Sequence, residues 1–289
     1  MPVRKSRRAA APSIEMKRPP LRQRLHVRPM RGLPFNKMIP NILTLLALCA
    51  GMTAIRLALG EHYREAVVAI FVAAILDGID GRIARLLKGT SEFGAELDSL
   101  SDFVSFGVAP ALLMYIWTLQ SFSSLGWVVA LLFAVCCALR LARFNTQIGA
   151  DLPPYAYNFF TGVPAPAAAG LALVPMMLQF EFGWSGFRNA WFGAFVLAGV
   201  AALMVSRVPT FSGKRFHMPR EWVMPLLLVI VGLAALATTE PWATLLLIGA
   251  IYLGSFPLSI RAYWRLRRAA DKLRAASRGE LVELEPKEG

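Results

Sequence analysis

Long apolar runs separated by short polar connections fill the sequence from residue 39 onward. Each run is close to the roughly 20 residues that a helix needs to cross a bilayer, and the runs do not resemble the alternating segments of a membrane barrel. The pattern therefore predicts an all-α, polytopic membrane helical bundle of about eight transmembrane helices. Their expected bounds are 39–59, 64–87, 93–118, 124–147, 159–180, 189–206, 221–238 and 242–264.

Charged residues in the connections indicate how these helices are oriented. The connections at 60–63, 119–123, 181–188 and 239–241 carry Glu61, Glu181, Glu240 and a single arginine, Arg188. The opposite connections and the tail are rich in basic residues, among them Lys88, Arg207, Lys214, Arg215, Arg220 and Arg261. Because basic residues gather on the cytoplasmic side, we expect both termini in the cytoplasm, which agrees with an even number of helices.

Composition supports a membrane protein with a basic N-terminal arm. Hydrophobic residues make up 56% of the chain and the mean hydropathy is +0.51, which is too apolar for an ordinary soluble domain. The net charge is +13, and residues 1–38 hold eleven lysines and arginines against one acidic residue, Glu15. We interpret 1–38 as a disordered cytoplasmic arm near anionic lipid, without a cleavable signal peptide and without a nucleic-acid partner. A transmembrane domain over 39–264 and a cytoplasmic tail over 265–289 follow.

Four aspartates interrupt the second and third apolar runs at a fixed spacing. They are Asp77, Asp80, Asp98 and Asp102. Positions 77, 80, 81, 84 and 85 share one face of a helix, and positions 94, 98 and 102 share one face of the next helix. Because a short turn joins these two helices, they are antiparallel neighbours, and their polar faces can meet near the cytoplasmic surface.

Four clustered carboxylates in a membrane imply cations, because an acidic side chain in the bilayer is costly unless it is neutralised. Hard oxygen ligands favour a divalent ion such as Mg²⁺ or Mn²⁺, and two such ions can clamp a diphosphate. Gly81 and Gly94 leave room where a nucleotide approaches the backbone. Ala84 keeps the surface small one turn further on, and Arg85 is a candidate partner of a phosphate or a carboxylate.

The spacing D-x2-D-G-x2-A-R-x8-G-x3-D-x3-D, matched here at all eight positions, resembles the signature of the CDP-alcohol phosphatidyltransferase family. That family moves a phosphatidyl group from a CDP-linked lipid to an alcohol and releases CMP. The resemblance implies that the four aspartates hold two divalent ions and that Asp102 is the base that deprotonates the alcohol. It also implies that Gly81, Ala84 and Gly94 line a cytidine pocket supported by Arg85, and that the protein is a homodimer.

The resemblance extends over about residues 36–260. Asn41, in the segment Pro40–Thr44, is a candidate ligand of the nucleotide or metal site, and N-capping of the first helix explains it equally well. Further segments look like the phosphatidylserine synthase branch of the family and favour L-serine as the acceptor. These segments are 105–110, 140–145, 161–166 and 209–214.

An acceptor with a carboxylate requires a cation at the cytoplasmic mouth of the site. Arg140, Arg143 and Lys214 are the candidate acceptor ligands, and Arg140 is favoured because it lies deeper in its apolar run. The general excess of basic residues on the cytoplasmic side, together with contact with lipid headgroups, explains these residues about as well as a role in binding the acceptor does.

The expected function is transfer of a phosphatidyl group from CDP-diacylglycerol to L-serine, in the inner (cytoplasmic) membrane with the active site facing the cytoplasm. The same chemistry with glycerol 3-phosphate, inositol phosphate or choline is an open alternative. A membrane prenyltransferase also uses two aspartate motifs and Mg²⁺, but it does not predict the fixed Gly81, Ala84, Arg85 and Gly94. A transporter whose acidic residues relay protons or bind cations has no reason to keep the full signature.

Overall fold

The computed structural model describes residues 35–87, 91–147, 159–206, 208–211, 223–265 and 268. The predicted arm over 1–38 lies outside the described residues up to residue 34, and α1 begins at Phe35, earlier than the predicted residue 39. Nearly all of the predicted tail over 265–289 also lies outside the described residues.

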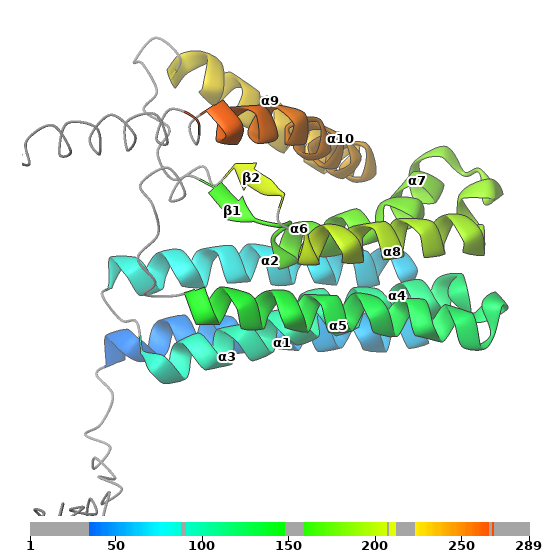
Figure 1. Cartoon of the computed structure of the whole chain (residues 1–289), viewed down its shortest axis with the longest axis horizontal. Coiled ribbons are helices and arrows are strands. Elements are labelled where there is room, and N and C mark those ends of the chain that lie inside the picture. Colours follow the sequence, from blue (N-terminus) through cyan, green and yellow to red (C-terminus); the bar gives the residue numbers. More distant parts are fainter. Residues whose placement is uncertain are drawn as a thin grey trace, which may run out of the picture. The chain divides into compact units, whose positions relative to one another are not determined.

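The described residues form ten α-helices and two short strands (Figure 1). The helices are α1 (Phe35–Leu59), α2 (Tyr63–Leu86), α3 (Glu92–Asp102), α4 (Ala109–Trp117), α5 (Ser124–Gln147), α6 (Ala165–Ala172), α7 (Val174–Phe182), α8 (Ala190–Val205), α9 (Val223–Thr239) and α10 (Pro241–Gly254). The strands are β1 (Phe159–Thr161) and β2 (Pro209–Phe211). A π-helical segment, Phe103–Val108, joins α3 to α4, and short 3-10 turns occupy Leu119–Phe122 and Ser185–Arg188.

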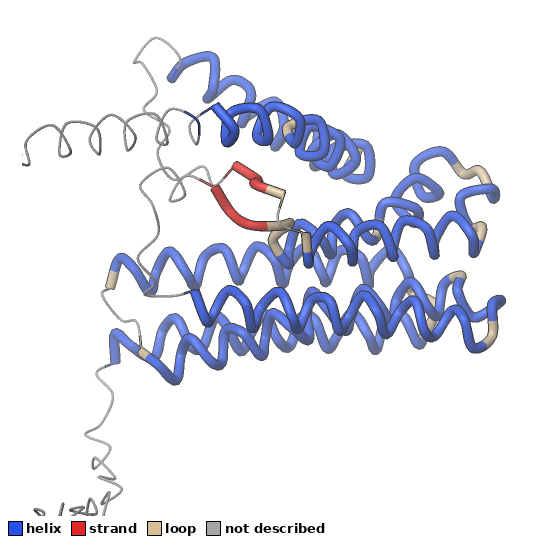
Figure 2. Tube along the Cα trace, in the orientation of Figure 1, coloured by secondary structure: helices blue, strands red, loops and turns tan. Residues whose placement is uncertain are grey.

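Each predicted apolar run contains a helix of the structure, but the run over 159–180 differs from the prediction at its start. Residues 159–161 form β1, which pairs antiparallel with β2 so that Phe160 faces Thr210 (Figure 2). Aromatic residues and threonine favour extended backbone, so the expectation of helix alone was wrong here. The rest of the run bends by 44° between α6 and α7. Pro175 in the first turn of α7 cannot continue the preceding helix, which explains the bend.

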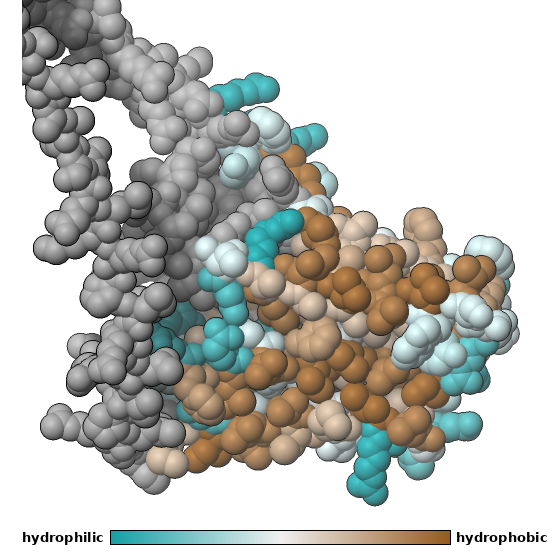
Figure 3. All heavy atoms as spheres, turned by 60° about the horizontal axis from the view of Figure 1, so that its bottom comes forward, coloured by the Kyte–Doolittle hydropathy of each residue, from teal (hydrophilic) through white to brown (hydrophobic). Residues whose placement is uncertain are grey.

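Within the described residues, four helical stretches are long and apolar enough to cross a membrane, and a fifth counts if α6 and α7 form one span. The four are Met38–Leu59, Glu92–Trp117, Ser124–Thr146 and Pro241–Arg265. Helix α2 has 24 residues but carries charged side chains near both ends, whereas α8 and most of α9 are apolar but shorter. Hydrophobic side chains also cover much of the face in Figure 3. The chain is therefore a multi-pass helical membrane protein, and the count of about eight spans and the orientation of the termini stay predictions.

Small residues allow the helices around the aspartates to pack closely. Helix α1 makes its most extensive contact with α2, and it also contacts α3, the π-helical segment and α4. A Cβ atom on Gly51 would overlap with Ser105 in the π-helical segment, so glycine is required where these two elements meet. The hydroxyl of Ser105 donates to the carbonyl oxygen of Ala47 at 3.3 Å. This packing fixes α3, which carries two of the aspartates, against α1.

Candidate active site

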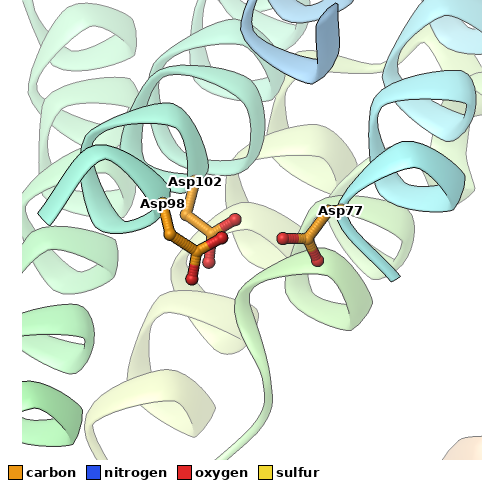
Figure 4. Close-up of side chains that lie close together, drawn as sticks. All are labelled: Asp77, Asp98 and Asp102. Carbon is orange, nitrogen blue, oxygen red and sulfur yellow. The ribbon is translucent and has the colours of Figure 1, made fainter. Parts of the chain in front are cut away.

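Three of the four aspartates converge from α2 and α3. Asp77, Asp98 and Asp102 each offer a carboxylate oxygen, and these atoms lie within 4.8 Å of one another. Figure 4 shows Asp77 facing the other two side chains, which lie one turn apart on α3. Among the residues that the structure describes, this is the group of acidic, histidine or cysteine side chains arranged to hold a metal ion. Because three carboxylates repel one another at this separation, the donor set fits a hard divalent cation such as Mg²⁺ or Mn²⁺.

Asp80, the fourth aspartate of the motif, has different neighbours. Its side chain is only 3% exposed, and its Oδ2 atom accepts a hydrogen bond of 2.8 Å from the hydroxyl of Thr44 in α1. Asp80 also lines a cavity that Asp98 shares. Asp98 therefore belongs both to the group of three carboxylates and to the wall of this cavity.

The cavity has a volume of about 450 Å³ and lies where α1, α2 and α3 meet. This volume is in the range of roughly 300–1,000 Å³ that is common for small-molecule sites. All five residues predicted to bind the nucleotide line the cavity, namely Asn41, Gly81, Ala84, Arg85 and Gly94. The remaining lining residues are Pro40, Thr44, Asp80, Ser91, Ala95, Asp98 and Phe144. The structure thus brings the predicted nucleotide ligands together beside the aspartates, while their roles stay predictions.

Gly81 and Gly94 lie in this cavity with different surroundings. A Cβ atom on Gly81 would have no heavy atom of the described residues within 4 Å, so this position opens into space. A Cβ atom on Gly94 would lie 2.9 Å from Oδ1 of Asn41 and 3.0 Å from Oγ of Ser91. Ser91 is the N-cap of α3 and accepts a hydrogen bond from the backbone N–H of Gly94. Gly94 therefore leaves room for the side chains of Asn41 and Ser91, which a larger residue would displace.

Asn41 and Arg85 both reach the cavity from inside their helices. Because α1 begins at Phe35, Asn41 does not cap this helix, and the alternative explanation of Asn41 as an N-cap is wrong. The Nε–H of Arg85 donates to the carbonyl oxygen of Gly81 at 2.9 Å. This bond holds the side chain along α2, and the terminal nitrogens of the guanidinium can still donate to a ligand.

The two arginines predicted to bind the acceptor have separate environments in α5. Arg140 is partly buried within electrostatic range of Asp102 and Asp77, and its Nε atom is buried without a hydrogen-bond partner among the described residues. Arg143 instead donates from a terminal nitrogen to the carbonyl oxygen of Val205, the last residue of α8, at 3.0 Å. Lys214 lies outside the described residues.

Segments that lie far apart in the sequence meet at the ends of α5 and α8. Asn145 and Ser99 exchange hydrogen bonds of 2.9 and 3.3 Å, which tie α5 to α3 beside Asp98. The backbone N–H of Gly162 donates to the carbonyl oxygen of Val208 at 2.8 Å, next to the β1–β2 pair. The segments around 143, 162 and 209 therefore form one connected region.

Thr44 and Phe144 are the lining residues of greatest interest to which the sequence analysis gave no role. Thr44 lies one turn beyond Asn41, and a hydroxyl at this spacing in an apolar run was the available signal. Phe144 belongs to one of the segments of family resemblance, but an aromatic residue near a helix end is common in any membrane protein. Only the packing of α5 against α3 places this ring at the cavity.

Comparison with known proteins finds two matching family models. The model described as CDP-alcohol phosphatidyltransferase matches residues 37–205, and the model described as CDP-alcohol phosphatidyltransferase 2 matches residues 221–257. The first match covers α1 to α8, including every residue of the aspartate motif. The second match covers α9 and α10.

Curated relatives carry names that agree with these matches. A protein of Mycobacterium tuberculosis named CDP-diacylglycerol–serine O-phosphatidyltransferase is 40% identical over 227 residues, 78% of this chain and 79% of the relative. A Helicobacter pylori protein of the same name is 34% identical over 76% of this chain and 91% of its own length. An archaetidylserine synthase of Methanothermobacter thermautotrophicus is 33% identical over 59% of this chain and 68% of its own length.

Proposed function

The chain belongs to the CDP-alcohol phosphatidyltransferase family, and from this membership we propose that it transfers the phosphatidyl group of CDP-diacylglycerol to L-serine, giving phosphatidylserine and CMP. The observation that carries the chemistry is the convergence of Asp77, Asp98 and Asp102 beside a cavity lined by all five predicted nucleotide ligands. The names of the relatives support serine as the alcohol.

We propose that the four aspartates hold two divalent ions, Mg²⁺ or Mn²⁺. The close group of Asp77, Asp98 and Asp102 supports one site, and Asp80 together with Asp98 at the cavity wall supports the second. When bound, such ions neutralise the phosphate oxygens and the charge that develops on the leaving group.

The residues around the cavity hold and orient the donor. The open space at Gly81 and the small side chain of Ala84 admit the nucleotide, and Asn41 lies within the same wall. Arg85 offers its terminal guanidinium nitrogens to a phosphate oxygen. These contacts place the phosphorus that carries the diacylglycerol near the aspartates, which brings the reacting groups together.

Asp102 takes the proton from the serine hydroxyl in the proposed transfer. The serine oxygen then bonds to the phosphorus that carries the diacylglycerol, and the bond from that phosphorus to the bridging oxygen breaks. CMP leaves with the electron pair. Arg140 holds the carboxylate of serine, and this role is supported by its partial burial near Asp102 and by its unpaired Nε atom.

The proposed setting is the inner, cytoplasmic membrane, with the site facing the cytoplasm and the protein a homodimer. The uneven distribution of basic residues supports this orientation. The homodimer is an expectation from the family resemblance.

Release of CMP from CDP-diacylglycerol by the purified full-length protein tests the proposed acceptor. L-serine, glycerol 3-phosphate, inositol phosphate and choline are supplied one at a time in the same lipid–detergent micelles. We expect CMP release and phosphatidylserine formation with L-serine alone. CMP release with a phosphorylated alcohol and none with serine would show that serine is not the acceptor, while the proposed chemistry of the aspartates would stand. No CMP release with any alcohol would contradict the proposed function.

Metal removal tests the aspartate chemistry separately. We expect excess chelator to abolish turnover and added Mn²⁺ or Mg²⁺ to restore it. Asp77→Asn and Asp98→Asn should each lower the rate by about a hundredfold or more, because each removes a charged ligand. Size-exclusion profiles that match the wild type show that the variants fold. Full turnover in excess chelator is incompatible with the two-metal proposal.

A further inference from the structure

A buried hydroxyl in α1 lies against the carboxylate of Asp80. The side chain of Thr44 is 5% exposed, and its hydroxyl is 2.8 Å from Oδ2 of Asp80 and 3.0 Å from the carbonyl oxygen of Pro40. A hydroxyl has one proton to donate, and a bond to a charged acceptor is stronger than a bond to a neutral one. The carboxylate of Asp80 is therefore the preferred acceptor.

Thr44 is itself fixed by the helix that carries Asp98 and Asp102. The hydroxyl of Ser101 in α3 donates to the backbone carbonyl oxygen of Thr44 at 3.1 Å, and Ser101 is only 3% exposed. The β-branched side chain of threonine also has few rotamers in a helix. A hydrogen-bonded path from Ser101 through Thr44 to Asp80 therefore links all three helices around the aspartates.

This path constrains the orientation of Asp80. One carboxylate oxygen of Asp80 is engaged by Thr44, and the residue lines the same cavity as Asp98. We propose that Thr44 is a positioning residue that holds the Asp80 carboxylate in place as a ligand for a divalent cation. The inference rests on the proposed function of the aspartates, and Thr44 acts only through Asp80. Partners that orient a metal-binding carboxylate typically change metal affinity by roughly 10–100-fold when they are removed.

Thr53 in the same helix provides a matched control. Its hydroxyl donates to the carbonyl oxygen of Cys49, four residues earlier, as the hydroxyl of Thr44 can donate to Pro40. Thr53→Val therefore removes the same kind of bond to the helix backbone without touching a carboxylate. Thr44→Val removes the bond to Asp80 at nearly constant side-chain volume, and Thr44→Ser retains it.

The experiment measures Mn²⁺ binding by the purified full-length protein without substrates, using the electron paramagnetic resonance signal of free Mn²⁺. The Mn²⁺ concentration for half-maximal CMP release is measured in parallel. We expect Thr44→Val to weaken Mn²⁺ binding and raise this concentration by about tenfold or more, while Thr44→Ser stays near the wild type. Thr53→Val should leave both quantities unchanged. If Thr44→Val does not fold, Thr44→Cys takes its place with the same expectation, because a thiol is a weak donor.

Wild-type Mn²⁺ affinity in the folded Thr44→Val or Thr44→Cys variant would overturn the inference, as would a wild-type protein that binds no Mn²⁺. An equal loss in Thr53→Val would also overturn it, because the effect would then belong to helix packing. The binding measurement requires no serine and no turnover. A failure to make phosphatidylserine would therefore contradict the proposed function and leave the role of Thr44 in Mn²⁺ binding unaffected.

Discussion

Gly81 and Gly94 both line the cavity, but only Gly94 lies close to other side chains. At Gly81 the missing side chain leaves space for a ligand. At Gly94 it allows Asn41 and Ser91 to approach the helix. The two positions therefore differ in what an added methyl group should disturb.

Alanine at each position separates these two effects. Gly81→Ala should raise the KM for CDP-diacylglycerol while the midpoint of thermal unfolding stays the same or rises, because alanine is the better helix former. Gly94→Ala should raise the midpoint less than Gly81→Ala does, or lower it, because the added methyl group must displace the side chains of Asn41 and Ser91. Thermal unfolding and CMP release at varied lipid concentration check both variants. Equal effects of the two substitutions on both measurements would contradict this distinction.

Arg140 presents a partly buried guanidinium near the aspartates. Loss of a hydrogen bond to a charged group typically costs about 1.5–3 kcal/mol, so Arg140→Ala should raise the KM for serine by roughly ten- to a hundredfold. The KM for CDP-diacylglycerol should change much less. Rates at varied serine and at varied lipid concentration measure the two effects. If the dependence of the rate on serine concentration is unchanged, Arg140 does not bind the acceptor and contributes only to the positive charge of the cytoplasmic side.

The aspartates could be predicted from spacing because both halves of the motif lie on regular helices. The different environment of Asp80 could not be predicted in this way. Its partner Thr44 belongs to a third helix, and the packing of α1 against α2 decides which side chains meet. The sequence favoured Arg140 over Arg143 by its depth alone. The bond of Arg143 to Val205 could not be predicted, since the end of α8 lies far from Arg143 along the chain.

At the scale of helices and strands, hydrophobicity located the segments but not their interruptions. The bend at α6–α7 depends on a proline, and the β1–β2 pair depends on two segments that are distant in the sequence. The π-helical segment after Asp102 likewise has no hydrophobic signature of its own. Single π-helical turns are frequent at functional sites, and this one begins directly after Asp102 at the end of α3.

The contact between α5 and the end of α8 leads to a prediction for Arg143. Its guanidinium binds the carbonyl oxygen of Val205, where a cation also interacts favourably with the helix dipole. Arg143→Ala should therefore lower the stability by about 1 kcal/mol, seen as a lower midpoint of thermal unfolding, and change the serine KM less than Arg140→Ala. Arg143→Lys serves as the control and should recover part of the stability. A higher serine KM at an unchanged midpoint would instead make Arg143 an acceptor ligand.

For the whole molecule, the positive-inside pattern leads to a test of topology. Single cysteines at His62, Glu240 and Lys214 are introduced into a variant without the native Cys49, Cys136 and Cys137. A membrane-impermeant maleimide applied to intact cells should label positions 62 and 240 and leave position 214 unlabelled. Lysed cells provide the control, in which position 214 should also react. Labelling of position 214 from outside would overturn the proposed orientation.

The charged residues of α2 also have a consequence for biogenesis. This helix contains Asp77, Asp80, Arg82 and Arg85, and a charged residue near the centre of an inserting helix costs roughly 2.5–3.5 kcal/mol. Helix α1 is strongly apolar and packs along α2 more extensively than along any other helix. We therefore expect the two helices to enter the bilayer during synthesis as a helical hairpin. Asp80, which accepts a hydrogen bond from Thr44 of α1, is then sheltered before α3 has left the ribosome, whereas Asp77 meets its partners only when α3 arrives.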